Sequence, residues 1–111
     1  MQVAEITLLK RAVSGKDKLN QPTYAVTETT VLARRVPVSQ SEFFSAGQIG
    51  ISADYEFIIS QFDYDGQTSL KYNGQVLRIY RKYERDDNEI ELYCEYAAGL
   101  NKKEVTPDGS V

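Results

Sequence analysis

The dipeptide Asn73-Gly74 constrains the fold of this chain more than any other local feature. It separates two runs, residues 69–72 and 75–84, whose composition suits β-strands. Asn-Gly is a preferred pair for a two-residue hairpin turn, because both turn positions require positive φ. The sequence therefore predicts an antiparallel hairpin with its turn at residues 73–74.

A second turn and a third strand extend this hairpin. Asp86-Asp87-Asn88 forms the predicted turn, and residues 89–96 alternate after it. The side chains expected to point inward are Ile90, Leu92, Cys94 and Tyr96, and those expected to point outward are Glu89, Glu91, Tyr93 and Glu95. Three strands joined by two short turns predict an antiparallel meander.

The N-terminal half supplies further strand candidates. Residues 4–11 and 23–30 have strand composition, and residues 31–38 are a third candidate that can continue the second through a bend. Between the first two, residues 13–21 are rich in turn-forming residues and predict a polar loop. Residues 53–60 alternate between an apolar and a mixed face, which indicates another strand.

One short helix is predicted between these strands. Ser39 and Glu42 have the spacing of a capping box, with Ser39 as the N-cap. Gly47 and Gly50 provide a natural stop after two or three turns. A helix this short is not stable alone, so we expect it to pack on the sheet.

Together these elements predict the fold class. The chain has 111 residues, enough for one domain. About six strands and one short α-helix predict a mainly β protein, either a small antiparallel β-barrel or a sandwich. We expect residues 1–96 to form this single β domain and residues 97–111 to form a flexible C-terminal tail.

Composition argues against most kinds of catalytic site. There is no histidine, which excludes Ser-His and Cys-His nucleophile pairs within the chain. The single cysteine, Cys94, can form neither an internal disulfide nor a cysteine zinc site, and we expect it to be a small buried hydrophobe. No catalytic motif is present, so we expect a protein that is not an enzyme and needs no cofactor and no metal. No apolar run approaches the ~18 residues that span a bilayer, so no membrane association is expected.

Two polar regions allow alternative interpretations. Basic residues and tyrosines alternate through residues 71–85, which suits either single-stranded nucleic acid or a solvated hairpin. The acidic residues of the turns could ligate a hard cation, although turn formation explains them better. They are Asp63, Asp65, Asp86, Asp87 and Glu89. The net charge of −3 does not suggest a general nucleic-acid binder.

The order of segments resembles the head–tail joining proteins of tailed bacteriophages, the head-closure or head–tail adaptor family. The resemblance covers residues 4–96. Its segments are 30–48 (TVLARRVPVSQSEFFSAGQ), 55–59 (YEFII), 70–79 (LKYNGQVLRI) and 91–94 (ELYC).

This resemblance implies a structural virion protein at the head–tail interface, assembled in the host cytoplasm. Such proteins form a homo-oligomeric ring, typically dodecameric, below the portal or adaptor protein. The ring helps to close the channel that holds the packaged double-stranded DNA, without sequence-specific binding, and it docks the tail. The implied partners are therefore further copies of the chain, the portal or adaptor, and tail-completion or tail proteins.

Two segments are candidate sites within this interpretation. The segment after the helix has small or apolar residues and no positive charge, and the resemblance implies that it is a channel-facing loop: Gln48, Ile49, Gly50, Ile51, Ser52, Ala53 and Asp54. The other interpretation is a helix–strand connection with Ile49 and Ile51 in the core. The predicted tail offers candidate partner-docking residues: Leu100, Lys102, Lys103 and Val105.

Other functions remain open at this point. A phage tail-completion or tail-terminator protein would belong to the same structural class. An OB-like nucleic-acid-binding barrel would use the tyrosines of residues 71–85. An enzyme subunit with a carboxylate site is a third class, for which no sequence feature speaks.

Overall fold

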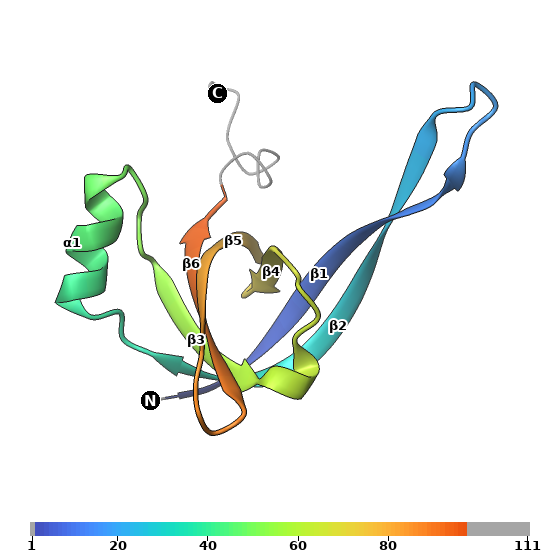
Figure 1. The fold of residues 1–111 in the computed structure, drawn as a ribbon. Helices are drawn as coiled ribbons and strands as arrows, with labels where there is room; N and C mark the ends of the chain where they lie inside the picture. Colours follow the sequence, from blue (N-terminus) through green and yellow to red (C-terminus); the bar gives the residue numbers. More distant parts are fainter. Residues whose placement is uncertain (1, 98–111) are drawn as a thin grey trace.

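The computed structural model describes residues 2–97, which form a closed six-stranded barrel with one α-helix and one short 3₁₀ helix (Figure 1). The elements are β1 (Gln2–Lys16), β2 (Pro22–Val36), α1 (Gln40–Gln48), β3 (Tyr55–Ser60), η1 (Gln61–Asp63), β4 (Ser69–Tyr72), β5 (Gln75–Glu84) and β6 (Glu89–Tyr96). All strand pairs are antiparallel, and the strand order around the barrel is β1-β2-β3-β6-β5-β4. The predicted small β-barrel with one short helix is confirmed, and the sandwich is wrong.

The barrel encloses a single apolar core. Its largest side chains are at most 2% exposed: Ile6, Leu8, Phe57, Ile59, Leu70, Leu77, Ile90, Leu92 and Cys94. Every strand except β2 contributes to this set, and β2 adds the buried Ala33. Each large aliphatic or aromatic side chain contributes about 1.5–3 kcal/mol when it leaves water. The inward alternation predicted for β6 is confirmed at three positions and wrong at Tyr96, which is 37% exposed.

The predicted meander is present as β4, β5 and β6. Asn73 and Gly74 have φ of 52° and 77°, so the turn uses the left-handed conformations that the dipeptide predicted. Tyr72 and Gln75 pair on either side of it. A β-bulge lies in β5 between Ile79 and Arg81, and the extra residue is Tyr80.

The first two strands are much longer than predicted. β1 continues to Lys16, so the predicted loop over residues 13–21 is wrong, and the actual turn covers only residues 17–21. Asp17 organises this turn, because its carboxylate accepts hydrogen bonds from the backbone N–H groups of Leu19 and Gln21. The two strand candidates at residues 23–30 and 31–38 form one continuous strand, β2.

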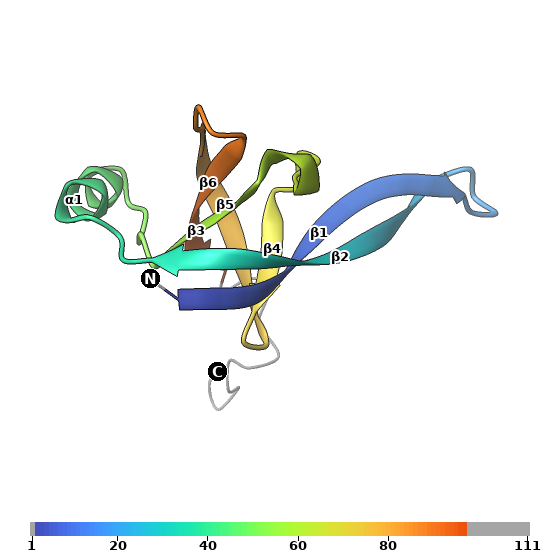
Figure 2. The same cartoon turned by 90° about the horizontal axis from the view of Figure 1, so that it is seen from below.

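The outer half of this hairpin projects from the barrel (Figures 1 and 2). β4 pairs with β1 only at Thr7–Leu9, and β3 pairs with β2 only at Arg34–Val36. Residues 10–27, called the arm below, therefore have no third strand among residues 2–97. The radius of gyration is accordingly 15.9 Å, against about 13 Å for a compact domain of this size.

The helix begins as the sequence predicted. Ser39 is the N-cap, and its hydroxyl accepts a hydrogen bond of 3.0 Å from the backbone N–H of Glu42. The expected packing on the sheet is slight, because Ala46 is the one buried residue of α1. Phe43 and Phe44 are 54% and 64% exposed. α1 therefore lies beside the barrel with an uncovered aromatic face.

Candidate functional site

The carboxylate of Glu42 links α1 to the barrel. Tyr80 donates a hydrogen bond of 2.8 Å to Glu42 Oε2, and Arg81 forms an ion pair with Oε1. These two consecutive residues reach one carboxylate because Tyr80 is the extra residue of the bulge in β5. Burial alone would raise the pKa of Glu42, but the hydrogen bonds from Arg81 and Tyr80 outweigh burial and lower that pKa.

A second carboxylate, Glu56 of β3, lies near this contact and is only 9% exposed. Burial raises its pKa to about 7, and the negative charges of Glu91 and Glu42 add to the increase, against the opposing effect of Arg81 and Arg85. Glu56 therefore carries a charge at an energetic cost above neutral pH. No sequence pattern indicates this cluster, because its members come together from β3, β5, β6 and α1.

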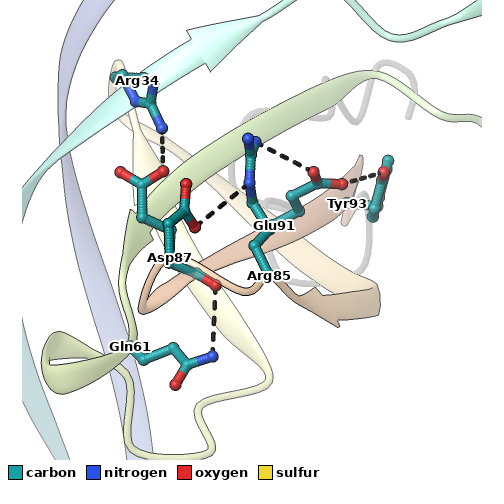
Figure 3. Close-up of polar contacts among 7 residues, drawn as sticks. Arg34, Gln61, Arg85, Asp87, Glu91 and Tyr93 are labelled. Carbon is teal, nitrogen blue, oxygen red and sulfur yellow. Dashed lines mark hydrogen bonds and ion pairs between the residues drawn. The ribbon is translucent and has the colours of Figure 1, made fainter.

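Glu91 of β6 completes the cluster (Figure 3). It accepts a hydrogen bond of 2.5 Å from Tyr93 and pairs with Arg85 at 3.3 Å. Arg85 also lies 3.6 Å from a carboxylate oxygen of Asp87. The outward position predicted for Tyr93 does not expose it: the residue is 8% exposed, and the Arg81 guanidinium lies 4.2 Å from the centroid of its ring. Hydrogen bonds and ion pairs therefore hold the carboxylates of Glu42 and Glu91 in place.

The acidic side chains of the turns do not converge. Asp65 forms an ion pair of 2.8 Å with Lys10 of the arm, and Asp87 pairs with Arg85. Within residues 2–97, no group of three or more potential metal ligands is close enough to hold an ion. Cys94 is 0% exposed as predicted, and burial raises the pKa of its thiol, which keeps the reactive thiolate unpopulated at neutral pH.

Most basic side chains of residues 71–85, the hairpin considered for nucleic-acid binding, form ion pairs with carboxylates of the same chain. Lys71 pairs with Glu28 at 3.0 Å, and Arg78 pairs with Glu95. Arg81 and Arg85 pair with carboxylates of the cluster described above. Lys82 lies 5.3 Å from the centroid of the Tyr64 ring. The positive charge that this hairpin could offer to phosphates is therefore largely neutralised.

The predicted channel-facing loop, Gln48 to Asp54, divides into two halves. Ile49 is 73% exposed, whereas Ile51 is half-buried and Ala53 is 6% exposed. Asp54 fixes the second half to β6, because its carboxylate accepts a hydrogen bond of 2.8 Å from the backbone N–H of Tyr96. The alternative in which both isoleucines lie in the core is wrong for Ile49. Whether the exposed half faces a channel stays a prediction.

The candidate docking tail lies outside the described residues, and this holds for Leu100, Lys102, Lys103 and Val105. The described chain ends at Ala97, whose backbone N–H donates a hydrogen bond of 3.2 Å to the carbonyl of Val76. The C-terminal segment therefore follows a residue that is hydrogen-bonded to β5.

The arm carries an exposed apolar patch that the sequence does not predict, because residues 13–21 have the composition of a loop. Val13 pairs with Tyr24, and Arg11 pairs with Val26, so these four side chains share one face. Val13, Tyr24 and Val26 are 63%, 51% and 56% exposed, and the Arg11 guanidinium lies 4.1 Å from the Tyr24 centroid. We call Val13, Tyr24 and Val26 the arm patch.

Comparison with known proteins supports the fold and leaves the function open. No family model and no curated protein matches the chain. Among solved structures, the solution structure of protein SF1141 from Shigella flexneri 2a is similar, with a TM-score of 0.66 and 19% sequence identity. The match covers 86% of this chain and 92% of the Shigella chain. In the described part of the chain, no helix has both the length and the hydropathy to cross a membrane.

Proposed function

We propose that this protein is a structural subunit of the head–tail connector of a tailed bacteriophage. In this role it forms a ring below the portal or adaptor, helps to close the DNA channel and docks the tail. The observation that carries the proposal is the arm, a hairpin that projects from the barrel with nearly all of its residues exposed. The proposal joins this feature to the segment order that resembles head–tail joining proteins.

The arm is understandable as an assembly element. A two-stranded ribbon is marginally stable in water without a third strand or a covering surface. The arm patch leaves three large apolar side chains in solvent on such a ribbon. Contacts with a neighbouring subunit would cover these side chains and stabilise the ribbon, as a ring requires.

The charges of the chain suit a channel through which DNA passes without being held. The net charge is −3, and the loop from Gln48 to Asp54 contains no Lys or Arg. Like charge repels phosphate, whereas each basic contact would retain DNA. The exposed half of the loop, around Ile49 and Gly50, is the part we propose for closure. The ring would be located at the head–tail interface of the virion and would contain no cofactor.

The alternative functions make different predictions. A nucleic-acid-binding barrel of the OB type would need free basic side chains along residues 71–85, and the ion pairs of Lys71, Arg78, Arg81 and Arg85 argue against it. A tail-completion or tail-terminator protein would share the ring architecture and act on the tail itself. We assign no catalytic residues in this proposal.

Deletion of the coding gene from the phage or prophage that carries it tests the proposal. Electron microscopy of the lysate should show normal tails and separate heads without tails, and expression of the chain in trans should restore joined particles. Aberrant tails would instead indicate the tail-completion or terminator function. Normal joined particles without the protein would overturn the proposal.

A further inference from the structure

A second exposed apolar patch lies at the other side of the molecule from the arm. Phe43 and Phe44 of α1 pack edge to face, with centroids 6.0 Å apart, and both are more than half exposed. We call Phe43 and Phe44 the α1 patch. Figure 1 shows α1 and the arm extending from the barrel in opposite directions.

The two regions also differ in charge. Residues 10–27 contain four basic residues and one acidic residue, a formal net charge of +3. Residues 37–97, which include α1 and the other four strands, contain five basic and eleven acidic residues, a formal net charge of −6. An arm is therefore attracted to the body of another copy and repelled by another arm.

Position and charge together favour one kind of contact. A two-fold symmetric dimer centred on the arm patch would bring two positively charged arms together. Two different patches at opposite ends let each copy contact the next through unlike surfaces. Such a heterologous contact closes into a ring when the rotation between neighbouring copies permits closure. The three apolar side chains of the arm patch and the two aromatic rings of the α1 patch give such a contact a hydrophobic centre.

We propose that the arm patch of one copy docks on the α1 patch of the next copy and so forms the repeating contact of the ring. This inference rests on the proposed connector function and names the surfaces that would build it. The occupant of the α1 patch is a second copy of this chain. Val13, Tyr24 and Val26 pack against Phe43 and Phe44, while the cationic arm lies over the acidic body.

Cysteine cross-linking of the full chain tests this contact. The variants V26C and F44C are prepared separately, mixed at high protein concentration and treated with a short bismaleimide. Native Cys94 is fully buried, so wild-type protein serves as the background control. The matched control replaces V26C by T27C, because Thr27 is exposed on the opposite face of the same strand.

The V26C and F44C mixture should give a dimer yield several-fold above that of the T27C and F44C mixture. Raising the salt to about 1 M, where the screening length falls to about 3 Å, should reduce this yield. Equal yields in the two mixtures, or efficient dimers of V26C alone, would overturn the inference. Those results would leave the deletion phenotype unaffected, so failure of this contact is distinguishable from failure of the connector function.

Discussion

The phenol of Tyr80 donates a hydrogen bond of 2.8 Å to the carboxylate of Glu42 and so connects the bulge of β5 to the first turn of α1. Arg81 forms an ion pair with the other carboxylate oxygen. Since Ala46 is the one buried residue of the helix, this polar contact has a large share in holding α1 against the barrel. It also sets the position of the α1 patch.

Removal of this contact should loosen the helix while the barrel stays folded. We expect Glu42→Ala to accelerate amide hydrogen exchange throughout α1 and to lower the free energy of unfolding by about 1–3 kcal/mol, since hydrogen bonds to a charged group are lost. A nine-residue helix has little stability of its own. Ser45→Ala, an exposed change in the same helix, is the control. Unchanged exchange in α1 of Glu42→Ala would contradict this account.

The buried carboxylate of Glu56 should make stability depend on pH. Its pKa is raised from 4.5 to about 7 in the folded protein, so the folded state binds more protons than the unfolded state between these values. Stability therefore falls as the pH rises from about 4.5 to 7 and stays lower above it. At about 1.4 kcal/mol per pH unit, the cost of ionising Glu56 in the folded protein is about 3 kcal/mol at pH 8.

Glu56→Gln removes this ionisation while it keeps the shape of the side chain. We expect the variant to unfold at a higher temperature than wild type at pH 8 and to differ little from it at pH 5. The exposed Glu84→Gln on β5 is the matched control and should show no such pH-dependent difference. A variant with the same stability difference at both pH values would show that Glu56 does not titrate in this range.

The two isoleucines of the loop after α1 should behave differently when replaced. Ile49→Ser should change the free energy of unfolding by less than about 0.5 kcal/mol, because the side chain is 73% exposed. Ile51→Ser should cost about 1–2 kcal/mol, because that side chain is half-buried. If the exposed half of the loop closes the channel, heads assembled with Ile49→Ser should also leak DNA. Fully retained DNA would remove the loop from the closure mechanism.

The segment after Ala97 should be dispensable for folding. β6 ends at Tyr96, and Ala97 supplies the last backbone hydrogen bond to β5. A chain truncated after Ala97 should therefore show the thermal unfolding midpoint of the full chain. We predict that it joins heads to tails less efficiently, because the candidate docking residues are lost. Wild-type infectivity of particles with the truncated chain would exclude that docking role.

Local signals in the sequence predicted the elements whose structure depends on neighbouring residues. The Ser39 cap and the Asn73-Gly74 turn are where they were predicted, because both depend on a few adjacent residues. The length of the arm was missed, because Gly15 and the polar residues around it have turn composition. Cross-strand pairing nevertheless keeps residues up to Lys16 in β1.

The buried polar cluster could not be predicted for a different reason. Glu42 lies 38 and 39 residues from Tyr80 and Arg81, and the bulge that brings these two side chains together has no sequence signature. Glu56 lies on the mixed face that alternation predicts for residues 53–60, and such a face is solvent-exposed in a simple alternating sheet. Here the Glu56 carboxylate is buried and lies within the influence of Glu42, Glu91, Arg81 and Arg85.

The central claim is that this chain is a ring-forming component of the phage head–tail joint. The most direct measurement is the copy number of the chain in purified particles, by quantitative mass spectrometry, together with its position by immunogold electron microscopy. The account predicts a fixed number of copies per particle, and the resemblance to head–tail joining proteins implies that this number is typically twelve. It also predicts that all immunogold label lies at the junction of head and tail. Absence of the chain from particles, or label spread over the capsid or along the tail, would contradict it.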